Sequence, residues 1–334
     1  NIMSEKADID FVILWVDDQD PIWIEDKNKY KGQQGNHTNN EVRYRDWQNL
    51  KYWFRAVEKY APWVRKIHFV TCGQKPEWLN INHPKLNLVD HKDYIDEKYL
   101  PTFSSHVIEL NLHRIPDLTE KFVYFNDDMF LNDYVKPEDF FSETTPKDCA
   151  VLNTIKMDRE GIPHIIVNNL CVLSDYFDFK LQFKKNLTKW INPRYGKYML
   201  RTLFLLPWKE FAGFYELHTP YSYLKETFRE VWEKEEKYLE EVCEHKFRDD
   251  KDVNQWLMRY WQLANGNFVP RSPDFGKMYI INDDTTLILK DIEMNKHKTI
   301  CINDSSKISN FEKTKSEVLR AFEKKFPQKS NYEL

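Results

Sequence analysis

Apolar runs that end in acidic residues mark the first part of the chain. The segment from Ile9 to Val16 (IDFVILWV) is almost continuously apolar and is followed by Asp17 and Asp18. This pattern is typical of a strand that is buried on both faces and stops at a polar edge of its sheet. Similar runs predict further strands at 66–71, 86–89 and 122–125.

Helical patterns alternate with these strands. Apolar side chains three and four positions apart predict an amphipathic helix over 42–61 that stops before Pro62, and a second helical segment over 104–114. Alternating strands and helices indicate a wound, mostly parallel α/β sheet. We therefore predict an α/β fold built around one such sheet.

The pattern changes after about residue 143. Helical spacing dominates 222–243 and 252–264, and strand-like runs return at 278–281 and 299–302 before a closing helix near 310–325. We interpret 1–142 as an α/β core, 143–265 as a largely helical inserted lobe, and 266–334 as a return to the core sheet with a closing helix.

Composition narrows the class of protein. The 334 residues are 41% hydrophobic and 15% aromatic, which is enough to bury a large core. Lys and Arg total 49 against 53 Asp and Glu, a net charge of −4, and this near balance argues against a nucleic-acid-binding protein.

Cysteine use and hydropathy indicate a location. Five scattered cysteines without a C-x-x-C pair favour reduced thiols and a cytoplasmic protein. No stretch approaches the roughly 20 apolar residues of a membrane span, so we expect a soluble or peripheral protein. The chain begins at Asn1 rather than Met, as a fragment or trimmed chain would.

Polar residues follow three of the predicted strands. They are Asp17 and Asp18, the run Asn126, Asp127 and Asp128, and the pair Asn303 and Asp304. Ligands bind beyond the carboxyl ends of the strands in wound sheets, and converging carboxylates suit Mg²⁺ or Mn²⁺. The alternative is that these residues only end strands and cap helices.

Phosphate binding has to depend on a metal and on arginine, because the sequence has neither a P-loop nor a G-x-G-x-x-G motif. The candidate arginines are Arg43 and Arg45 near the first predicted helix, Arg114 and Arg248. The alternative for each is a solvated or ion-paired side chain.

Two further features have both a functional and a structural interpretation. His218, in ELHTPY before a long helix, is placed to accept a proton from a substrate hydroxyl, or it is a core histidine. The segment 180–208 has seven Lys or Arg and no acidic residue among aromatic and aliphatic side chains. It fits contact with an anionic polymer or a membrane surface, or equally a solvated helix face.

Several segments together resemble a known family. IDFVILWVD, then RYRDWQNLKYWF and FVYFNDDMF, and later ELHTP, HKFRDDKD and CINDS, resemble the four conserved blocks of the Stealth family. That family includes bacterial capsule and exopolysaccharide hexose-1-phosphate transferases and the eukaryotic N-acetylglucosamine-1-phosphotransferase of lysosomal enzymes. The match runs in order from Ile9 to about Ser305.

The resemblance implies a GT-A-like core and transfer of a sugar 1-phosphate from a UDP-sugar to a hydroxyl of a polysaccharide, with release of UMP. It implies that His218, Arg248 and Asp46 are catalytic. Substrate-binding residues are then expected at Asp17, Arg43, Arg114 and Asn126, and ligands of Mg²⁺ or Mn²⁺ at Asp127, Asp128, Asn303 and Asp304. Such an enzyme is expected in the cytoplasm, with peripheral membrane contact through 180–208.

Two other functions fit part of the same pattern. A metal-dependent GT-A glycosyltransferase would use the same carboxylates but release UDP. A carbohydrate-binding protein without activity would account for the 11 Trp and 18 Tyr, whose rings stack on sugars, but it has no use for the acidic and basic site residues together.

Overall fold

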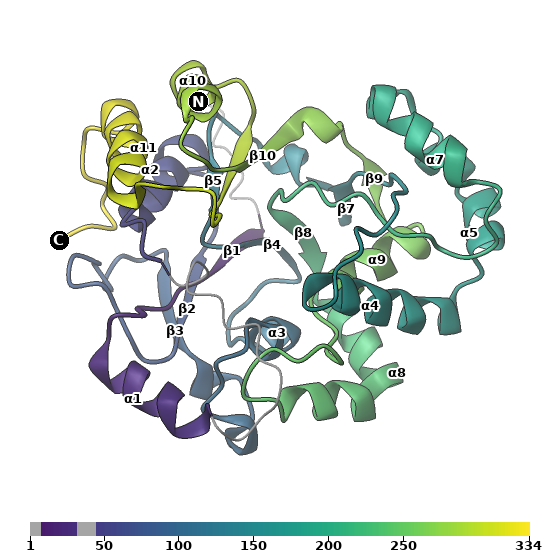
Figure 1. Ribbon diagram of the computed structural model, residues 1–334, viewed down its shortest axis with the longest axis horizontal. Helices are drawn as coiled ribbons and strands as arrows, with labels where there is room; N and C mark the ends of the chain where they lie inside the picture. The colour runs from purple at the N-terminus through teal and green to yellow at the C-terminus, as the bar shows by residue number, and fades with distance from the viewer. Residues whose placement is uncertain (1–7, 32–44) are drawn as a thin grey trace.

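The computed structural model describes residues 8–31 and 45–334. Its central sheet has five strands in the spatial order β3 (Leu86–Asp90), β2 (Ile67–Thr71), β1 (Ile9–Leu14), β4 (Lys121–Phe125) and β8 (Tyr221–Leu224) (Figure 1). The first four are mutually parallel, and β8 runs antiparallel to β4. The predicted fold class, a wound and mostly parallel α/β sheet, is confirmed.

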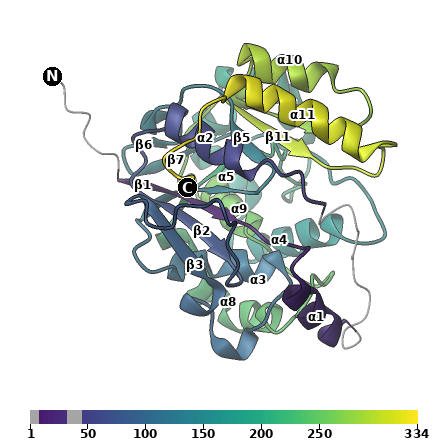
Figure 2. The ribbon, with the colours of Figure 1, turned by 90° about the vertical axis from the view of Figure 1, so that its left-hand side faces the viewer.

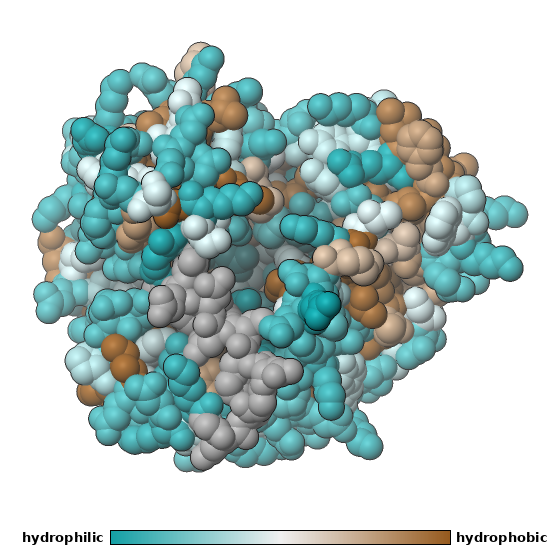
Figure 3. Space-filling view, viewed as in Figure 1, coloured by the Kyte–Doolittle hydropathy of each residue, from teal (hydrophilic) through white to brown (hydrophobic). Residues whose placement is uncertain are grey.

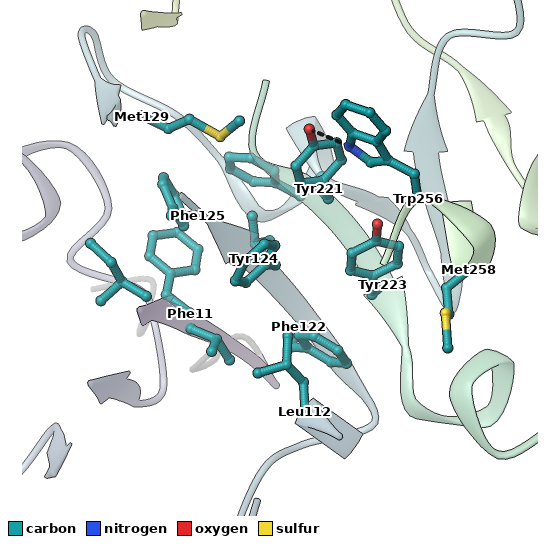
Figure 4. Packing of buried hydrophobic residues seen from close by; sticks show 14 of the residues in the cluster. Phe11, Leu112, Phe122, Tyr124, Phe125, Met129, Tyr221, Tyr223, Trp256 and Met258 are labelled. Carbon is teal, nitrogen blue, oxygen red and sulfur yellow. Dashed lines mark hydrogen bonds between the residues drawn. The ribbon is translucent and has the colours of Figure 1, made fainter. Parts of the chain in front are cut away.

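Aromatic side chains form the core against the sheet (Figure 4). Phe11 of β1 contacts Phe125 of β4 with ring centroids 4.9 Å apart, and Trp53 lies 5.3 Å from Phe125 on the same side. All three side chains are fully buried. Because β1 and β4 are covered on both faces, they are apolar at almost every position.

Three helices follow early strands: α1 (Pro21–Tyr30), α2 (Leu50–Tyr60) and α3 (Ser105–Leu110). The helix predicted over 42–61 begins only at Leu50, and 42–44 lie outside the described residues. Gln48 has φ 54° and donates its backbone N–H to Asp46, so residues 46–48 form a side-chain-capped turn instead of a helix. The end of α2 before Pro62 agrees with the prediction.

The segment 143–265 is mostly helical and occupies the right-hand side of Figure 1. Its helices are α4 (Ile162–Tyr176), α5 (Phe179–Lys185), α6 (Leu187–Trp190), α7 (Met199–Leu205), α8 (Lys225–Cys243) and α9 (Trp256–Ala264). It also contributes β8 to the main sheet. The domain boundaries at 142 and 265 stay a prediction, because one continuous hydrophobic core joins both sides of each boundary.

Two small sheets accompany the main one. β7 (Thr145–Asp148) pairs with β6 (Phe141–Ser142) and β9 (Val269–Pro270). Short 3-10 helices lie at His91–Asp93, Glu97–Tyr99, Leu112–Arg114, Pro137–Asp139, Pro193–Tyr198 and Pro273–Phe275.

The other small sheet corrects a prediction. β10 (Gly276–Ile280) and β11 (Thr299–Asn303) pair in parallel, and β11 pairs antiparallel with β5 (Met129–Leu131). The expected return of 266–334 to the core sheet is therefore wrong. The edge beside β4 is already occupied by β8, so the returning strands pair with β5 instead.

Two helices complete this part of the molecule. α10 (Thr286–Met294) and α11 (Phe311–Lys325) lie together above β5 and β11 (Figure 2). α11 is the closing helix predicted near 310–325. Its Phe322 contacts Phe130 of β5, with ring centroids 5.0 Å apart.

Candidate active site

Strand direction brings distant residues to one edge of the sheet. β1 and β4 are parallel, so Asp17 and Asn126–Asp128 follow their ends at the same edge. β8 is antiparallel to β4, with Tyr221 opposite Tyr124, so the segment before β8 starts at that edge. His218 lies in this segment, and it leads into a strand rather than directly into a helix. The structure thus brings His218 to the edge that carries Asn126–Asp128.

Asp127 and Asp128 form a crowded pair of carboxylates. Oδ1 of Asp128 is buried and has no hydrogen-bond partner among the described residues. Burial, and then the negative charge of Asp127, raises the pKa of Asp128 to about 7. A buried carboxylate oxygen without a donor beside a second carboxylate is costly unless a cation accompanies it. This pair therefore fits a divalent cation.

Cys301 of β11 faces the same pair and links it to the segment before β8. Burial raises the pKa of the Cys301 thiol, and the carboxylates of Asp128, Asp127 and Glu216 raise it further. Glu216 is two residues before His218, so the segment before β8 lies close enough for its charge to act on β11.

The other two predicted metal ligands, Asn303 and Asp304, form hydrogen bonds with other residues of the chain. In the part of the chain that the structure describes, no three His, Cys, Asp or Glu side chains come close enough to form a metal site by themselves. Asp304 accepts hydrogen bonds from Nε of Arg45 at 2.9 Å and from Nε1 of Trp47 at 3.1 Å. The backbone carbonyl of Asn303 accepts from Ile281. Metal roles for Asn303 and Asp304 stay predictions.

A second acidic group follows β1. Burial raises the pKa of Asp18, and the charges of Asp46 and Asp17 raise it further, so these three carboxylates are near one another. The backbone of Asp17 is held by Gln74, which accepts from its N–H at 2.8 Å and donates to its carbonyl at 2.9 Å. The structure thus groups Asp46 with the end of β1, as expected if both belong to one site.

His218 is held in an unusual backbone conformation. Its φ of 48° lies in the left-handed region, which residues other than glycine rarely adopt. The His218 N–H donates to Oε1 of Glu216 at 2.9 Å, and the ring packs edge-on against Trp256 with centroids 6.1 Å apart. The imidazole nitrogens have no hydrogen-bond partner in residues 8–31 and 45–334, so they are available to a substrate.

A buried network fixes Glu216 and, through it, His218. The hydroxyl of Tyr221 donates to Glu216 at 3.1 Å and accepts from Nε1 of Trp256 at 2.9 Å (Figure 4). Arg259 reaches Glu216 at 3.4 Å and binds Asp148 through two nitrogens at 2.9 and 3.1 Å. Because Arg259 is almost fully buried, this network anchors the strained residue to the core.

Arg248 is set in a loop beside the amino end of α3. Its Nε and Nη2 donate to the hydroxyl of Ser105 at 3.1 and 2.5 Å. No carboxylate among the described residues lies within salt-bridge distance of this guanidinium. An arginine that is half-buried and bound to a neutral hydroxyl keeps its charge for an anionic ligand.

The loop of Arg248 depends on the buried carboxylate of Asp252. This group accepts from His106 at 2.7 Å, from His245 at 2.6 Å and from the Asp249 backbone at 2.9 Å. Burial alone would raise the pKa of Asp252, but the hydrogen bonds from His106 and His245 lower it. The hydrogen bond to Asp252 raises the pKa of His245.

These shifts predict a pH-dependent stability. The raised His245 pKa contributes stability below its ordinary 6.5, and this is lost as the pH rises through the folded value. The lowered Asp252 pKa contributes above its ordinary 3.8, and this is lost as the pH falls. Both contributions are present between these values. Asp252→Asn should lower the free energy of unfolding by about 2–4 kcal/mol near pH ~5.5, and by less near pH ~8.5.

Urea denaturation at the two pH values measures this difference. His245→Gln is the control, because in its background the effect of Asp252→Asn should depend less on pH. An equal loss at both pH values in the otherwise wild-type chain would contradict the assignment.

Of the other predicted arginines, Arg114 lies away from this site. Arg114 follows α3 on the side where β4 begins, with its guanidinium 4.2 Å above the ring of Trp232 and a hydrogen bond to Asn111. The structure therefore gives its expected substrate contact no support. Arg43 lies outside the described residues.

Sequence reasoning did not select Glu216, Arg259, Cys301 or Ser105. Each of these residues contacts a partner more than 40 positions away in the sequence, or holds a backbone turn. A local sequence pattern does not reveal such contacts. A local signal existed only for Glu216, which is the acidic residue of ELHTP and lies two positions before His218. Arg45 was a candidate phosphate ligand, but the structure pairs it with Asp304.

The chain resembles known proteins over nearly its full length. Residues 7–35 match conserved region 1 of Stealth proteins, and residues 43–148 match conserved region 2. The capsular polysaccharide phosphotransferase WcwK of Streptococcus pneumoniae is 46% identical over 99% of both chains. The exopolysaccharide phosphotransferase cps2G of Lactiplantibacillus plantarum is 43% identical, covering 99% of this chain and 97% of that protein.

Among solved structures, the galactosyltransferase LgtC with donor and acceptor sugar analogues aligns over 96% of each chain, with a TM-score of 0.43 and 10% identity.

The receptor polysaccharide phosphotransferase WefC of Streptococcus oralis is 41% identical, covering 98% of this chain and 99% of that protein. With such identity over full-length relatives, the chain belongs to the Stealth family and is a phosphotransferase.

Proposed function

We propose that this enzyme transfers a sugar 1-phosphate from a UDP-sugar to a hydroxyl of a growing cell-surface polysaccharide. The observation that carries the proposal is the shared edge of the sheet, where both the Asp127–Asp128 pair and the segment that carries His218 lie. The full-length relatives named as polysaccharide phosphotransferases support the choice of acceptor.

In the proposed step, the acceptor oxygen bonds to the phosphorus that carries the sugar. The bond from that phosphorus to the bridging oxygen breaks, and UMP leaves with the bridging oxygen. The proton of the acceptor hydroxyl passes to the imidazole of His218. Arg248 neutralises charge on the phosphate oxygens, and the product is a phosphodiester.

Mg²⁺ or Mn²⁺ fits the proposal as a cofactor. Asp127 and Asp128 would hold the ion, and phosphate oxygens of the donor would complete its oxygen ligands. The buried Oδ1 of Asp128 without a partner in the described chain supports this assignment. When bound, the ion supplies positive charge to the phosphates.

The nucleoside of the donor has a candidate position at the ends of β2 and β3. A cavity of about 200 Å³ lies there, lined by Trp23 and Phe103 and by the carboxylates of Asp20 and Asp90. Aromatic faces suit a nucleobase, and a carboxylate accepts the imide N–H of uracil. We propose that the uracil occupies this cavity.

The nucleotide product tests the proposed function. A panel of UDP-sugars is incubated with an oligosaccharide primer and Mg²⁺, and the released nucleotide is separated by chromatography. UMP together with an acceptor that gains a sugar phosphate is expected. UDP together with an acceptor that gains a sugar alone would identify a glycosyltransferase and overturn the proposal.

We also propose that the segment 180–208 contacts an anionic membrane surface. No helix in the described ranges is long and apolar enough to cross a bilayer. Large apolar side chains are nevertheless exposed on α5 and α7, including Leu181, Leu200, Phe204 and, just after α7, Trp208. Figure 3 shows hydrophobic residues gathered over α7 at the upper right. A solvated helix face would not expose these side chains, and the neighbouring lysines complement anionic lipid headgroups.

Vesicle binding tests this contact. Phe204→Ser with Trp208→Ser should lower partitioning onto phosphatidylglycerol vesicles about tenfold or more. Lys184→Gln with Lys185→Gln should lower it by a similar factor, but less at high salt, because salt already screens these charges. Lys189 is left unchanged because its Nζ donates to the carbonyl of Gly266 at 2.6 Å.

The control is Met294→Ser, which removes an equally exposed apolar side chain on α10. Unchanged vesicle binding in both double variants would contradict the membrane contact. If the lysine variant instead lost only the use of long anionic acceptors, the segment would be a polymer-binding surface.

A further inference from the structure

A second cavity borders the segment that carries His218. It has a volume of about 410 Å³ and lies between β10, α10, the 3-10 helix Pro193–Tyr198 and residues 215–217 (Figure 1 shows β10, α10 and β8). None of its lining residues comes from β1, β2 or β4. It is therefore separate from the strand ends where the donor is proposed to bind, but Leu217 in its wall is adjacent to His218.

The cavity is lined by an excess of positive charge. Four exposed lysines line it: Lys197 in the 3-10 helix, Lys277 in β10, Lys290 in α10 and Lys296 in the loop after α10. None of them forms an ion pair within the described residues. Four unpaired ammonium groups around one cavity repel one another, and an anionic ligand removes that repulsion.

The acidic residues of the lining are fewer than the lysines, and two of the three are already bound within the protein. Glu216 is already bound by Arg259, Tyr221 and the His218 N–H. The Asp291 carboxylate is buried and accepts from Tyr279 at 2.6 Å and from Asn132 at 2.9 Å. Asp274 is the remaining acid in the lining. The lysines therefore outnumber the acids that face a ligand.

Three uncharged side chains also line the cavity, and β10 is fixed against the His218 segment. Tyr215, Leu217 and Met278 supply apolar surface of the kind on which sugar rings pack. At Gly276 a Cβ atom would lie 2.4 Å from Cγ2 of Thr219 and 2.3 Å from Oγ1 of Thr299. This close approach holds β10 against the residue after His218, so a ligand in the cavity has a fixed position relative to the imidazole.

We propose that this cavity binds an anionic stretch of the acceptor glycan, through a phosphodiester next to the sugar whose hydroxyl is extended. The inference deepens the proposed function and rests on it for the identity of the acceptor. Each transfer creates one phosphodiester, so an acceptor that has already been extended carries the group that the lysines would bind. The enzyme would then favour its own product as the next acceptor.

Direct binding separates this inference from the proposed activity. The probe is a short poly(glycerol phosphate) oligomer, and a neutral dextran oligomer of similar length is the reference, both measured by calorimetry. Lys277→Gln, Lys290→Gln and Lys296→Gln are combined. Lys197 is left unchanged because it also belongs to the basic segment 180–208.

We expect the triple variant to bind the phosphodiester oligomer about tenfold or more weakly at low salt, and to bind dextran as the wild type does. The matched control combines Lys136→Gln, Lys237→Gln and Lys313→Gln, which removes three exposed lysines outside the cavity and should change neither affinity. Equal binding of the phosphodiester oligomer by the triple variant and the wild type would overturn the inference.

Steady-state kinetics add a second readout. The triple variant should show a higher KM for a phosphodiester-containing acceptor, and an unchanged KM for the donor and for a neutral acceptor. If the wild type binds the oligomer but transfers no sugar phosphate, the proposed function fails while the binding site stands. An equal rise in KM for charged and neutral acceptors would contradict a phosphodiester site.

Discussion

Asp128→Asn is expected to lower turnover by at least about 10²–10³-fold while the protein stays folded. The change keeps the shape of the side chain but removes the charge that would hold a cation beside Asp127. In the wild type one oxygen of this carboxyl group is buried and lacks a donor in the described chain, and the pKa of the group is raised to about 7. Such a group destabilises the folded state when it is ionised without a cation.

The melting temperature of Asp128→Asn, measured without metal, should therefore equal or exceed that of the wild type. Asp128→Ala should lose turnover as well. The control is Asp284→Asn, an exposed residue that accepts from the Thr286 N–H and can be replaced by the amide. If Asp128→Asn retains wild-type turnover, or if chelation of divalent ions leaves turnover unchanged, the metal assignment is wrong.

His218→Ala is expected to lower the transfer rate by about 10²–10⁴-fold, the usual range for a positioned general base. A sugar hydroxyl is a very weak acid, so its attack on phosphorus needs a group that accepts the proton as the bond forms. The His218 imidazole has no partner among the described residues and lies at the edge that carries Asp127 and Asp128. Nucleotide affinity should change little.

Stability measurements separate a catalytic histidine from a structural one. The backbone of residue 218 is held by Glu216 whatever the side chain, so the melting temperature of His218→Ala should stay close to that of the wild type. His164→Ala, at a histidine that contacts the carbonyl of Arg159, should keep full activity. A variant of His218 that keeps most of its turnover would place the base elsewhere, with Asp17 or Asp46 the next candidates.

Glu216 has a positioning role in this account. Its carboxylate holds the left-handed backbone of His218, and Arg259 and Tyr221 hold the carboxylate. This chain of contacts explains how a residue with an unfavourable φ keeps its imidazole directed to one place.

The strands of the main sheet could be predicted because their signal is local. Burial on both faces requires apolar residues at almost every position, and β1, β2, β3 and β4 all lie where the runs predicted them. Direction then follows from the alternation with helices, and this was enough to place Asp17 and Asn126–Asp128 at one edge.

The rest depended on pairing between distant segments. β8 adds to the sheet antiparallel, but its four residues continue directly into α8, and the sequence showed only the helix. β11 pairs with β5 because β8 already occupies the edge of the main sheet beside β4. Arg45 donates a hydrogen bond to Asp304, which lies 259 positions away in the sequence. These contacts depend on which strand edges and charged side chains are still unpaired once the core has formed, and a local sequence pattern does not show this.

The position of the donor phosphorus after the reaction tests the central claim most directly. A UDP-sugar carrying a radioactive label in the phosphate next to the sugar is incubated with an oligosaccharide primer and Mg²⁺, and the polymer is separated from free nucleotides. Our account predicts that the label moves into the polymer, in a phosphodiester, at the same rate as unlabelled UMP appears. Label that stays in UDP while the polymer gains only sugar would contradict it.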